Sequence, residues 1–176
     1  MIETLISSKT RVKLLLKFFL NSGVRSYLRN LESEFSESTN AIRIELNKFE
    51  KAGMLHSRPE GNKKMFWANT GHPLFSDLNS MVRKHVGLDR IVTDVAAELG
   101  NLEKAYLTGH YANGNQSDTI DLVLIGNVDP KHLKTLCMKA KKSIHKHINY
   151  KVFKHNATFD KLCEESKGKY LLLWEH

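Results

Sequence analysis

Three helical patterns and one hairpin pattern follow one another in the first 70 residues, and this order constrains the fold more than any other feature of the chain. SSKTRVKLLLKFFLNSG offers Ser7 or Ser8 as a helix cap and repeats apolar residues at helical spacing up to Gly23. SYLRNLESEF, with Tyr27 on its apolar stripe, and TNAIRIELNKFEKAGML show the same period. MLHSRPEGNKKMFWANT alternates around the turn PEGNKK, which predicts two antiparallel strands.

The third helical pattern has polar residues opposite its buried stripe of Ile42, Leu46 and Phe49. Arginine can bond guanine through two hydrogen bonds, asparagine can do the same for adenine, and lysine near a hairpin tip can contact phosphate. A solvated helix face offers the alternative explanation. The residues predicted to contact DNA are Thr39, Asn40, Arg43, Asn47, Lys48, Lys63 and Lys64.

Over about residues 8 to 70 the chain resembles bacterial winged-helix regulators of the arsenic-repressor-like group. The segments NAIRIELNKFEKAGML and GNKKMFWANTGHPLF carry this resemblance. It implies that the third helix enters the major groove of DNA while the hairpin contacts the backbone or the minor groove. The Cys and His ligands of the metal-sensing members have no counterpart, so we predict no metal sensing.

Charge and composition favour a globular protein with an anionic partner. The 176 residues include 27 basic and 19 acidic side chains, and residues 1–75 hold 12 basic and 7 acidic ones, a net charge of +5. The start MIETLISSKTR lacks the order of a signal peptide, and no apolar run could span a bilayer. We therefore expect a cytoplasmic protein without membrane partners, in which Cys137 and Cys163 are buried free thiols.

Two apolar helical patterns connect the halves of the chain, in HPLFSDLNSMVRKHVGLDRIVTDVAAELG. Pro73 fits the first turn of the earlier helix, and Gly100 fits the end of the later one. These helices could pair two chains into a homodimer or simply pack on their own domain, and the pattern leaves both open. The predicted domains are residues 1–72, connecting helices 73–100, and residues 101–176.

From residue 104 onward, strand patterns alternate with helices in KAYLTG, TIDLVLIG, PKHLKTLCMKAKKSIHK, INYKVFK, ATFDKLCEES and KYLLLWE. Over about residues 88 to 160 this order, with a glycine-led loop between the first two strands, resembles the minimal nucleotidyltransferase domain of the polymerase-beta-like superfamily. That resemblance implies a Gly-Ser loop that holds a triphosphate, and an Asp-x-Asp strand plus a third carboxylate that hold two divalent cations.

The chain departs from this pattern at three places. Gly109 matches the loop glycine, but His110 replaces the serine. Asp121 matches the second aspartate, whereas Asp118 lies three residues earlier and would face the other side of a regular strand. A bulge could turn Asp118 back. The strand INYKVFK, where the third carboxylate belongs, has none.

Taken together, the sequence predicts an α+β protein in which a winged helix-turn-helix precedes a degenerate, mixed-sheet nucleotidyltransferase-like domain. The predicted function is a transcriptional regulator that binds double-stranded DNA at specific sequences, without enzymatic activity. One alternative is an active Mg-dependent nucleotidyltransferase that uses Asp118 and Asp121. Another is a sensor that binds a nucleotide through Gly109, His110 and Gly114, and Asp121 is the one candidate metal ligand. The histidines, among them His145, His147 and His155, are interpreted as surface residues of a basic patch.

Overall fold

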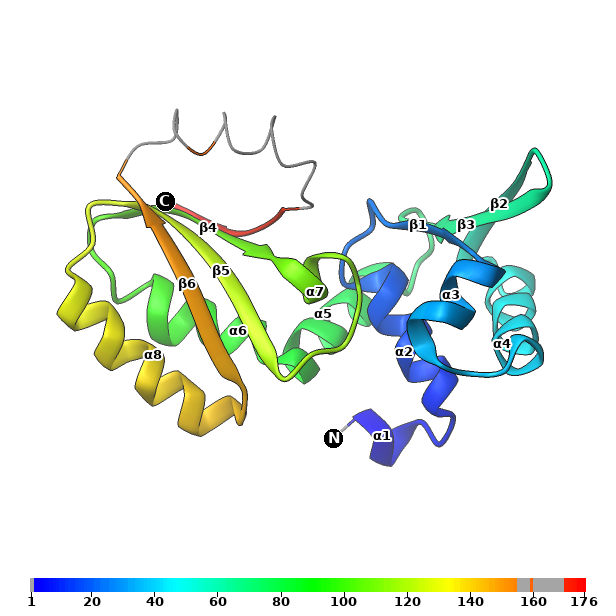
Figure 1. The fold of residues 1–176 in the computed structure, drawn as a ribbon, viewed down its shortest axis with the longest axis horizontal. Helices are drawn as coiled ribbons and strands as arrows, with labels where there is room; N and C mark the ends of the chain where they lie inside the picture. The colour runs from blue at the N-terminus through cyan, green and yellow to red at the C-terminus, as the bar shows by residue number, and fades with distance from the viewer. Residues whose placement is uncertain (1, 155–158, 160–169) are drawn as a thin grey trace. The chain divides into compact units, whose positions relative to one another are not determined.

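The computed structural model describes residues 2–154, 159 and 170–176, which divide into two compact units. The first unit comprises Met1–His85 with Gly114–Gln116, and the second comprises Val86–Asn113 with Ser117–His176. Figure 1 traces both units in a mixed α+β arrangement with one sheet in each. The predicted fold class is confirmed at this level.

Two helices of the first unit begin behind serine caps. After the short α1 (Ile2–Leu5), α2 (Lys9–Phe19) begins behind Ser8, whose side chain accepts a hydrogen bond from the Arg11 amide. α3 spans Leu28–Phe35, and α4 spans Thr39–Lys51 behind the cap Ser38. Such caps satisfy amide groups that have no partner inside the helix, and Ser8 is one of the two serines predicted to cap the first helix.

A three-stranded sheet completes this part of the unit, in the order β1-β3-β2. The hairpin strands β2 (Leu55–Glu60) and β3 (Lys63–Ala68) are antiparallel, as predicted, and β1 (Arg25–Tyr27) pairs with the outer edge of β3. The prediction that Tyr27 lies in a helix was wrong, because Tyr27 is opposite Met65 in the sheet. Such a pairing between distant segments leaves no local periodic signal.

The core of the first unit forms where the apolar faces of its helices meet. α5 (Phe75–Val86) belongs to this unit, and the side-chain amide of Asn79 donates a 2.6 Å hydrogen bond to the carbonyl of Phe19 near the end of α2. Pro73 lies just before α5. Residues with almost no exposed surface include Leu14, Phe18, Phe19, Leu31, Ile42, Leu46 and Val82.

The second unit is built on a four-stranded sheet in the order β6-β5-β4-β7. Its strands are β4 (Leu102–Thr108), β5 (Thr119–Gly126), β6 (His147–Phe153) and β7 (Leu171–Glu175). β5 runs parallel to β6 and antiparallel to β4, and β7 is antiparallel to β4. Between β4 and β5 the predicted glycine-led loop begins with a helical turn, α7 (Gly109–Ala112).

Helices cover one face of this sheet. They are α6 (Leu88–Ile91), a π-helical turn (Val92–Ala96) that continues it, and α8 (Pro130–Ile144), which begins behind the cap Asp129. Cys137 of α8 is buried, as predicted, and burial raises the pKa of its thiol to about 11. The helix predicted for ATFDKLCEES, together with Cys163 and His155, lies outside the described residues apart from Phe159. No helix within the described ranges is long and apolar enough to cross a bilayer.

Candidate functional site

The outer face of α4 presents the polar residues that the sequence singles out. Asn40, Arg43 and Asn47 are exposed, and Thr39 at the start of the helix is half-buried. The opposite face buries Ile42, Glu45, Leu46 and Phe49. The spacing of the buried residues therefore leaves the three exposed side chains on one accessible stripe.

Ile44 belongs to the same exposed stripe and was missed in the sequence prediction. It lies four residues after Asn40 and is 45% exposed, although it is a large apolar residue. The i, i+4 spacing from Asn40 would have revealed its position, but apolar residues were assigned to the buried side. The stripe thus combines amide, guanidinium and apolar groups.

An ion pair at Glu45 fixes α4 against α2. Glu45 is 7% exposed, and its carboxylate accepts two hydrogen bonds from Arg11, at 2.8 Å from Nε and 3.2 Å from Nη2. The hydrogen bond from Arg11 lowers the pKa of Glu45 against the opposing effect of burial, and Lys48 adds a contact at 3.2 Å. The exposed face of α4 is consequently held in a fixed orientation, while the charge of Lys48 is partly neutralised.

The lysines of the hairpin also have partners within the unit. The Lys63 ammonium lies 4.3 Å from the centre of the Tyr27 ring. Lys64 forms a 2.7 Å ion pair with Glu50, and the hydrogen bond from Lys64, followed by one from Ser57, lowers the pKa of the Glu50 carboxyl. An incoming phosphate would meet Lys63 directly, whereas it would have to compete with Glu50 for Lys64.

A hollow of about 420 Å³ lies between the hairpin tip and the starts of α3 and α4. It brings Thr39 together with both hairpin lysines, but does not include Asn40, Arg43, Asn47 or Lys48. Arg29 and Asn62 were not predicted as part of this hollow. Arg29 comes close to the hairpin through the long-range pairing of β1, and Asn62 lies in the hairpin turn itself. The hollow is lined by Tyr27, Leu28, Arg29, Glu32, Thr39, Asn62, Lys63 and Lys64.

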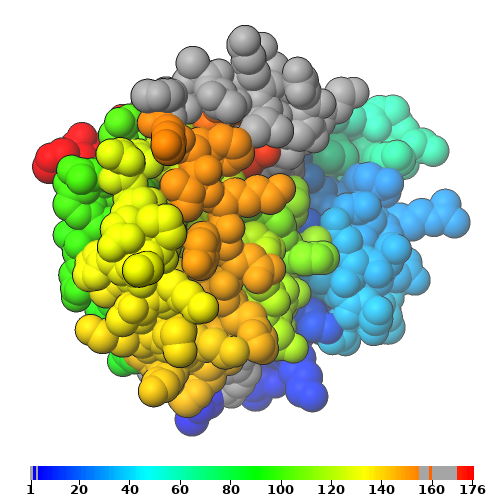
Figure 2. All heavy atoms as spheres, turned by 60° about the vertical axis from the view of Figure 1, so that its left-hand side comes forward, coloured from blue at the N-terminus to red at the C-terminus, as the bar shows by residue number. Residues whose placement is uncertain are grey.

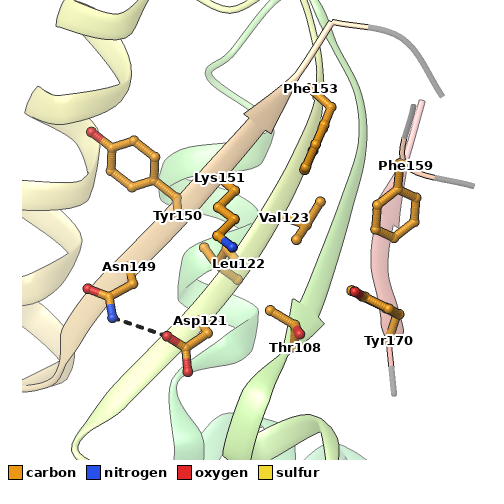
Figure 3. A pocket seen from close by; sticks show the side chains of 10 residues that line it. All are labelled: Thr108, Asp121, Leu122, Val123, Asn149, Tyr150, Lys151, Phe153, Phe159 and Tyr170. Atoms are coloured by element: carbon orange, nitrogen blue, oxygen red, sulfur yellow. Dashed lines mark hydrogen bonds between the residues drawn. The ribbon is translucent and has the colours of Figure 1, made fainter. Parts of the chain in front are cut away.

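The second unit has a cavity of about 270 Å³ on the sheet face turned away from the helices (Figure 3). Thr108, Asp121 and Asn149 lie opposite one another on three adjacent strands. The Asn149 amide donates a 3.1 Å hydrogen bond to Oδ1 of Asp121. Farther along the same face, Val123, Phe153, Phe159 and Tyr170 form an aromatic and aliphatic wall.

Asp118 does not join Asp121 in this cavity. β5 begins at Thr119 and pairs with β6 without a register shift through Ile125. Asp118 is exposed just before the strand, and its carbonyl accepts a hydrogen bond from the His147 amide. Burial raises the pKa of the neighbouring Tyr111, and the charge of Asp118 adds to this shift. Thr119 is thus the residue two positions before Asp121 on the same strand face.

The groups around Asp121 do not fit a pair of divalent cations. Asn149 occupies the facing position on β6, and Lys151 follows two residues later on the same face with a positive charge. Two hard cations require several oxygen ligands, and a neighbouring ammonium repels them. Within the described part of the chain, no three His, Cys, Asp or Glu side chains come together to hold a metal.

Both glycines assigned to nucleotide binding have structural reasons to be glycine. Gly109 has φ +67°, and a Cβ there would press against the Asp121 carboxylate. Gly114 has φ +74°, and its backbone lies against the backbone of Lys17 in α2. His110 is exposed, and Asn113 closes the turn with a 2.9 Å hydrogen bond to the Gly109 carbonyl. The proposed nucleotide contacts of Gly109, His110 and Gly114 stay a prediction.

No protein-family model matches the chain, and no curated protein matches its sequence. Among solved structures, it is similar to a mutant of the toxin-antitoxin MntA-HpeT, with 17% identity over 51% of this chain and 73% of that chain and a TM-score of 0.41. A tri-AMPylated Shewanella oneidensis HEPN toxin in complex with MNT antitoxin gives 16% identity, coverage of 53% and 73%, and a TM-score of 0.39. A candidate nucleotidyltransferase of Sulfolobus solfataricus is 21% identical over 61% of this chain and 94% of that chain, with a TM-score of 0.35.

Proposed function

We propose that the chain is a transcriptional regulator whose first unit acts as a winged helix and binds double-stranded DNA at specific sequences. The observation that supports this proposal is the exposed stripe of α4, where Asn40, Arg43 and Asn47 lie opposite a fully packed face. In a duplex complex, α4 would enter the major groove, and these three side chains would meet base edges. Lys63, Lys64 and Lys48 would contact phosphates.

The order of elements agrees with this mode of binding. α2, α3 and α4 precede a two-stranded hairpin, and the hollow beside its tip brings Thr39 and the hairpin lysines together. A duplex backbone that follows the hairpin would place phosphate oxygens near Lys63. The bound sequence can be found by selection from a random duplex library.

Arg43→Ala and Lys63→Ala should have different effects on DNA binding. Arg43→Ala is expected to weaken binding to the selected site by about 1–3 kcal/mol more than binding to random duplex, because a bidentate contact to a base is lost. Lys63→Ala should weaken both duplexes equally and reduce the slope of log K against log salt by about 1. Fluorescence anisotropy across a salt series measures both quantities.

Lys84→Ala is the matched control for these two variants, because Lys84 is exposed on α5 and outside the proposed interface. It should leave site discrimination and the salt slope unchanged. Equal losses on both duplexes from Arg43→Ala and Lys63→Ala would contradict the division between base and phosphate contacts.

Ile44 provides a sharper test of the same orientation of α4. An exposed isoleucine among polar groups can contact the C5-methyl group of thymine, which deoxyuridine lacks. We expect one thymine-to-deoxyuridine change in the selected site to weaken wild-type binding about threefold, since roughly one methyl group is no longer buried. Ile44→Ala should bind both sites with equal affinity.

The methyl experiment separates two failures. If no thymine position is sensitive in the wild type, Ile44 makes no such contact. If one position is sensitive and remains so in Ile44→Ala, a different residue contacts that methyl group. Titration of the selected duplexes in parallel, with Ile44→Val as the conservative variant, distinguishes these cases.

For the second unit, we propose that the sheet cavity is not a nucleotidyltransferase centre. The mismatch between its groups and two divalent cations supports this view, since Asp121 faces an amide and shares its face with Lys151. Incubation with labelled nucleoside triphosphates and Mg²⁺ or Mn²⁺ should yield no transferred label. Transfer that Asp121→Ala abolishes would establish the enzyme instead.

A further inference from the structure

One short segment of the second unit carries an unusually high density of positive charge. Residues 130–154 contain eight lysines and no carboxylate, whereas the other 151 residues contain 19 basic and 19 acidic side chains, which cancel. This segment alone therefore carries a formal net charge of +8, while the +5 of residues 1–75 is offset by an excess of acidic residues in the rest of the chain. The eight residues are Lys131, Lys134, Lys139, Lys141, Lys142, Lys146, Lys151 and Lys154.

The segment folds into α8 and β6, which lie side by side on one face of the unit (Figure 2). α8 buries Leu133, Leu136, Cys137 and Ala140, and all five of its lysines are exposed. We call the exposed side of α8 with the turn to β6 the α8 surface. None of its lysines forms an ion pair with a residue that the structure describes.

Ordinary helix stabilisation explains only part of this charge. Lys141 and Lys142 lie in the last turn, where cations favourably oppose the helix dipole. Lys131 with Lys134, and Lys139 with Lys142, are like-charge pairs at i, i+3, which destabilise a helix by a few tenths of a kcal/mol each. A bound polyanion would offset this repulsion through its attraction to each lysine.

A hollow of about 520 Å³ lies at the end of α8. Met138, 57% exposed, contributes the apolar part of its lining, and His145 occupies the left-handed region with φ 54°. The hollow therefore offers several cationic groups beside one apolar side chain, a combination suited to phosphate and sugar. It is lined by Met138, Lys141, Lys142, His145, Lys146 and His147.

The spacing of the lysines also suits a regular polyanion. Lys134 and Lys141 are seven residues apart, which is about 10 Å along a helix. One strand of duplex DNA advances about 3.4 Å per phosphate, so this distance covers roughly three phosphates. Because the side chains are long and flexible, they can follow the backbone without a base-specific geometry.

We infer that the α8 surface binds the phosphodiester backbone of double-stranded DNA independently of sequence. The inference rests on the proposed function for the choice of duplex DNA, but it concerns other residues in the other unit. It adds a sequence-independent contribution to affinity, with the strong salt dependence of lysine–phosphate contacts. Site discrimination remains with α4.

Protection of lysines from acetylation tests the inference on the full chain. The protein is acetylated with and without a random-sequence duplex at low salt, and mass spectrometry gives the modification rate at each lysine. Lys134, Lys141 and Lys142 should be protected at least threefold, with Lys84 as the unprotected reference. Equal rates at these lysines and at Lys84 would overturn the inference.

The same experiment separates this inference from the proposed function. Protection of Lys63 without protection of the α8 lysines rejects the inference and supports binding by the first unit. Protection of the α8 lysines without protection of Lys63 supports the inference and rejects the DNA interface proposed for the first unit. If neither group is protected, both are rejected.

A variant pair gives a second, quantitative test. Lys134→Gln with Lys141→Gln should reduce the slope of log K against log salt on random duplex by nearly 2, since each phosphate contact contributes about 0.9. Lys9→Gln with Lys84→Gln removes the same charge from exposed positions of the first unit and should leave the slope unchanged. If both double variants gave the same slope of log K against log salt, phosphate binding would not be localised on the α8 surface.

Discussion

Replacing Glu34 with alanine is expected to lower the free energy of unfolding of the first unit by about 2–4 kcal/mol. Lys17 is only 3% exposed, and its ammonium lies 2.6 Å from the Glu34 carboxylate and 3.2 Å from Oδ1 of Asn115. Glu34→Ala therefore removes a close carboxylate from beside a cation that stays buried. The cost falls below that of a fully buried pair, because the Glu34 side chain is 24% exposed and water can enter.

The two tryptophans make this measurement specific to one unit. Trp67 lies in β3 of the first unit and Trp174 in β7 of the second, so Trp174→Phe leaves a reporter for the first unit alone. In that background, urea titrations compare Glu34→Ala with Glu32→Ala, which removes the same charge from the same helix. Equal losses of unfolding free energy in the two variants would show that the contact between Lys17 and Glu34 does not stabilise the unit.

A double variant isolates the charge effect. Lys17→Met with Glu34→Gln removes both charges and fills most of the same volume. Its stability should return close to that of the parent, because replacement of a buried ion pair by packed neutral groups is often neutral or favourable. A double variant as unstable as Glu34→Ala would place the loss in packing rather than in the lost contact between Lys17 and Glu34.

Gly109→Ala should destabilise the second unit by about 2–4 kcal/mol. Its φ of +67° lies in the left-handed region, where a side chain costs about 1–2 kcal/mol. The added Cβ would also displace the Asp121 carboxylate from its contact with Asn149. Trp174 fluorescence in a Trp67→Phe background reports the unfolding of this unit.

Gly100→Ala and a double variant serve as controls for this effect. Gly100 does not have a positive φ, and a Cβ there would meet nothing within 4 Å, so the change should stay within about 0.5 kcal/mol. In the double variant Gly109→Ala with Asp121→Ala, the added Cβ no longer meets a carboxylate. The loss of unfolding free energy caused by crowding should therefore disappear, while the loss caused by the positive φ should remain. A loss in Gly109→Ala no larger than in Gly100→Ala would contradict the close approach of Asp121.

The local signals of the chain predicted α4 well. The apolar residues Ile42, Leu46 and Phe49 predicted the buried face, and the structure confirms it. Side-chain exposure of Asn40, Arg43 and Asn47 follows from the same period. Ile44 escaped prediction because an apolar residue was not expected on the accessible side.

Features that depend on pairing between distant segments could not be predicted. β1 pairs with β3 across about 40 residues, so Tyr27 and Arg29 were not placed beside the hairpin tip. The parallel register of β5 and β6 sets Asn149 opposite Asp121, although both residues were visible as polar positions. The register between two strands depends on how the whole strands pack. The residue pattern of one strand alone therefore does not predict which residue of the other strand lies opposite.

β6 is the outermost strand of its sheet among the residues that the structure describes, and it exposes Tyr150 and Val152. An outermost strand can add to the sheet of a second molecule and begin aggregation. Lys146, Lys151 and Lys154 lie along or beside it, so two such edges would repel each other. Their charge therefore disfavours edge-to-edge association of two copies through β6.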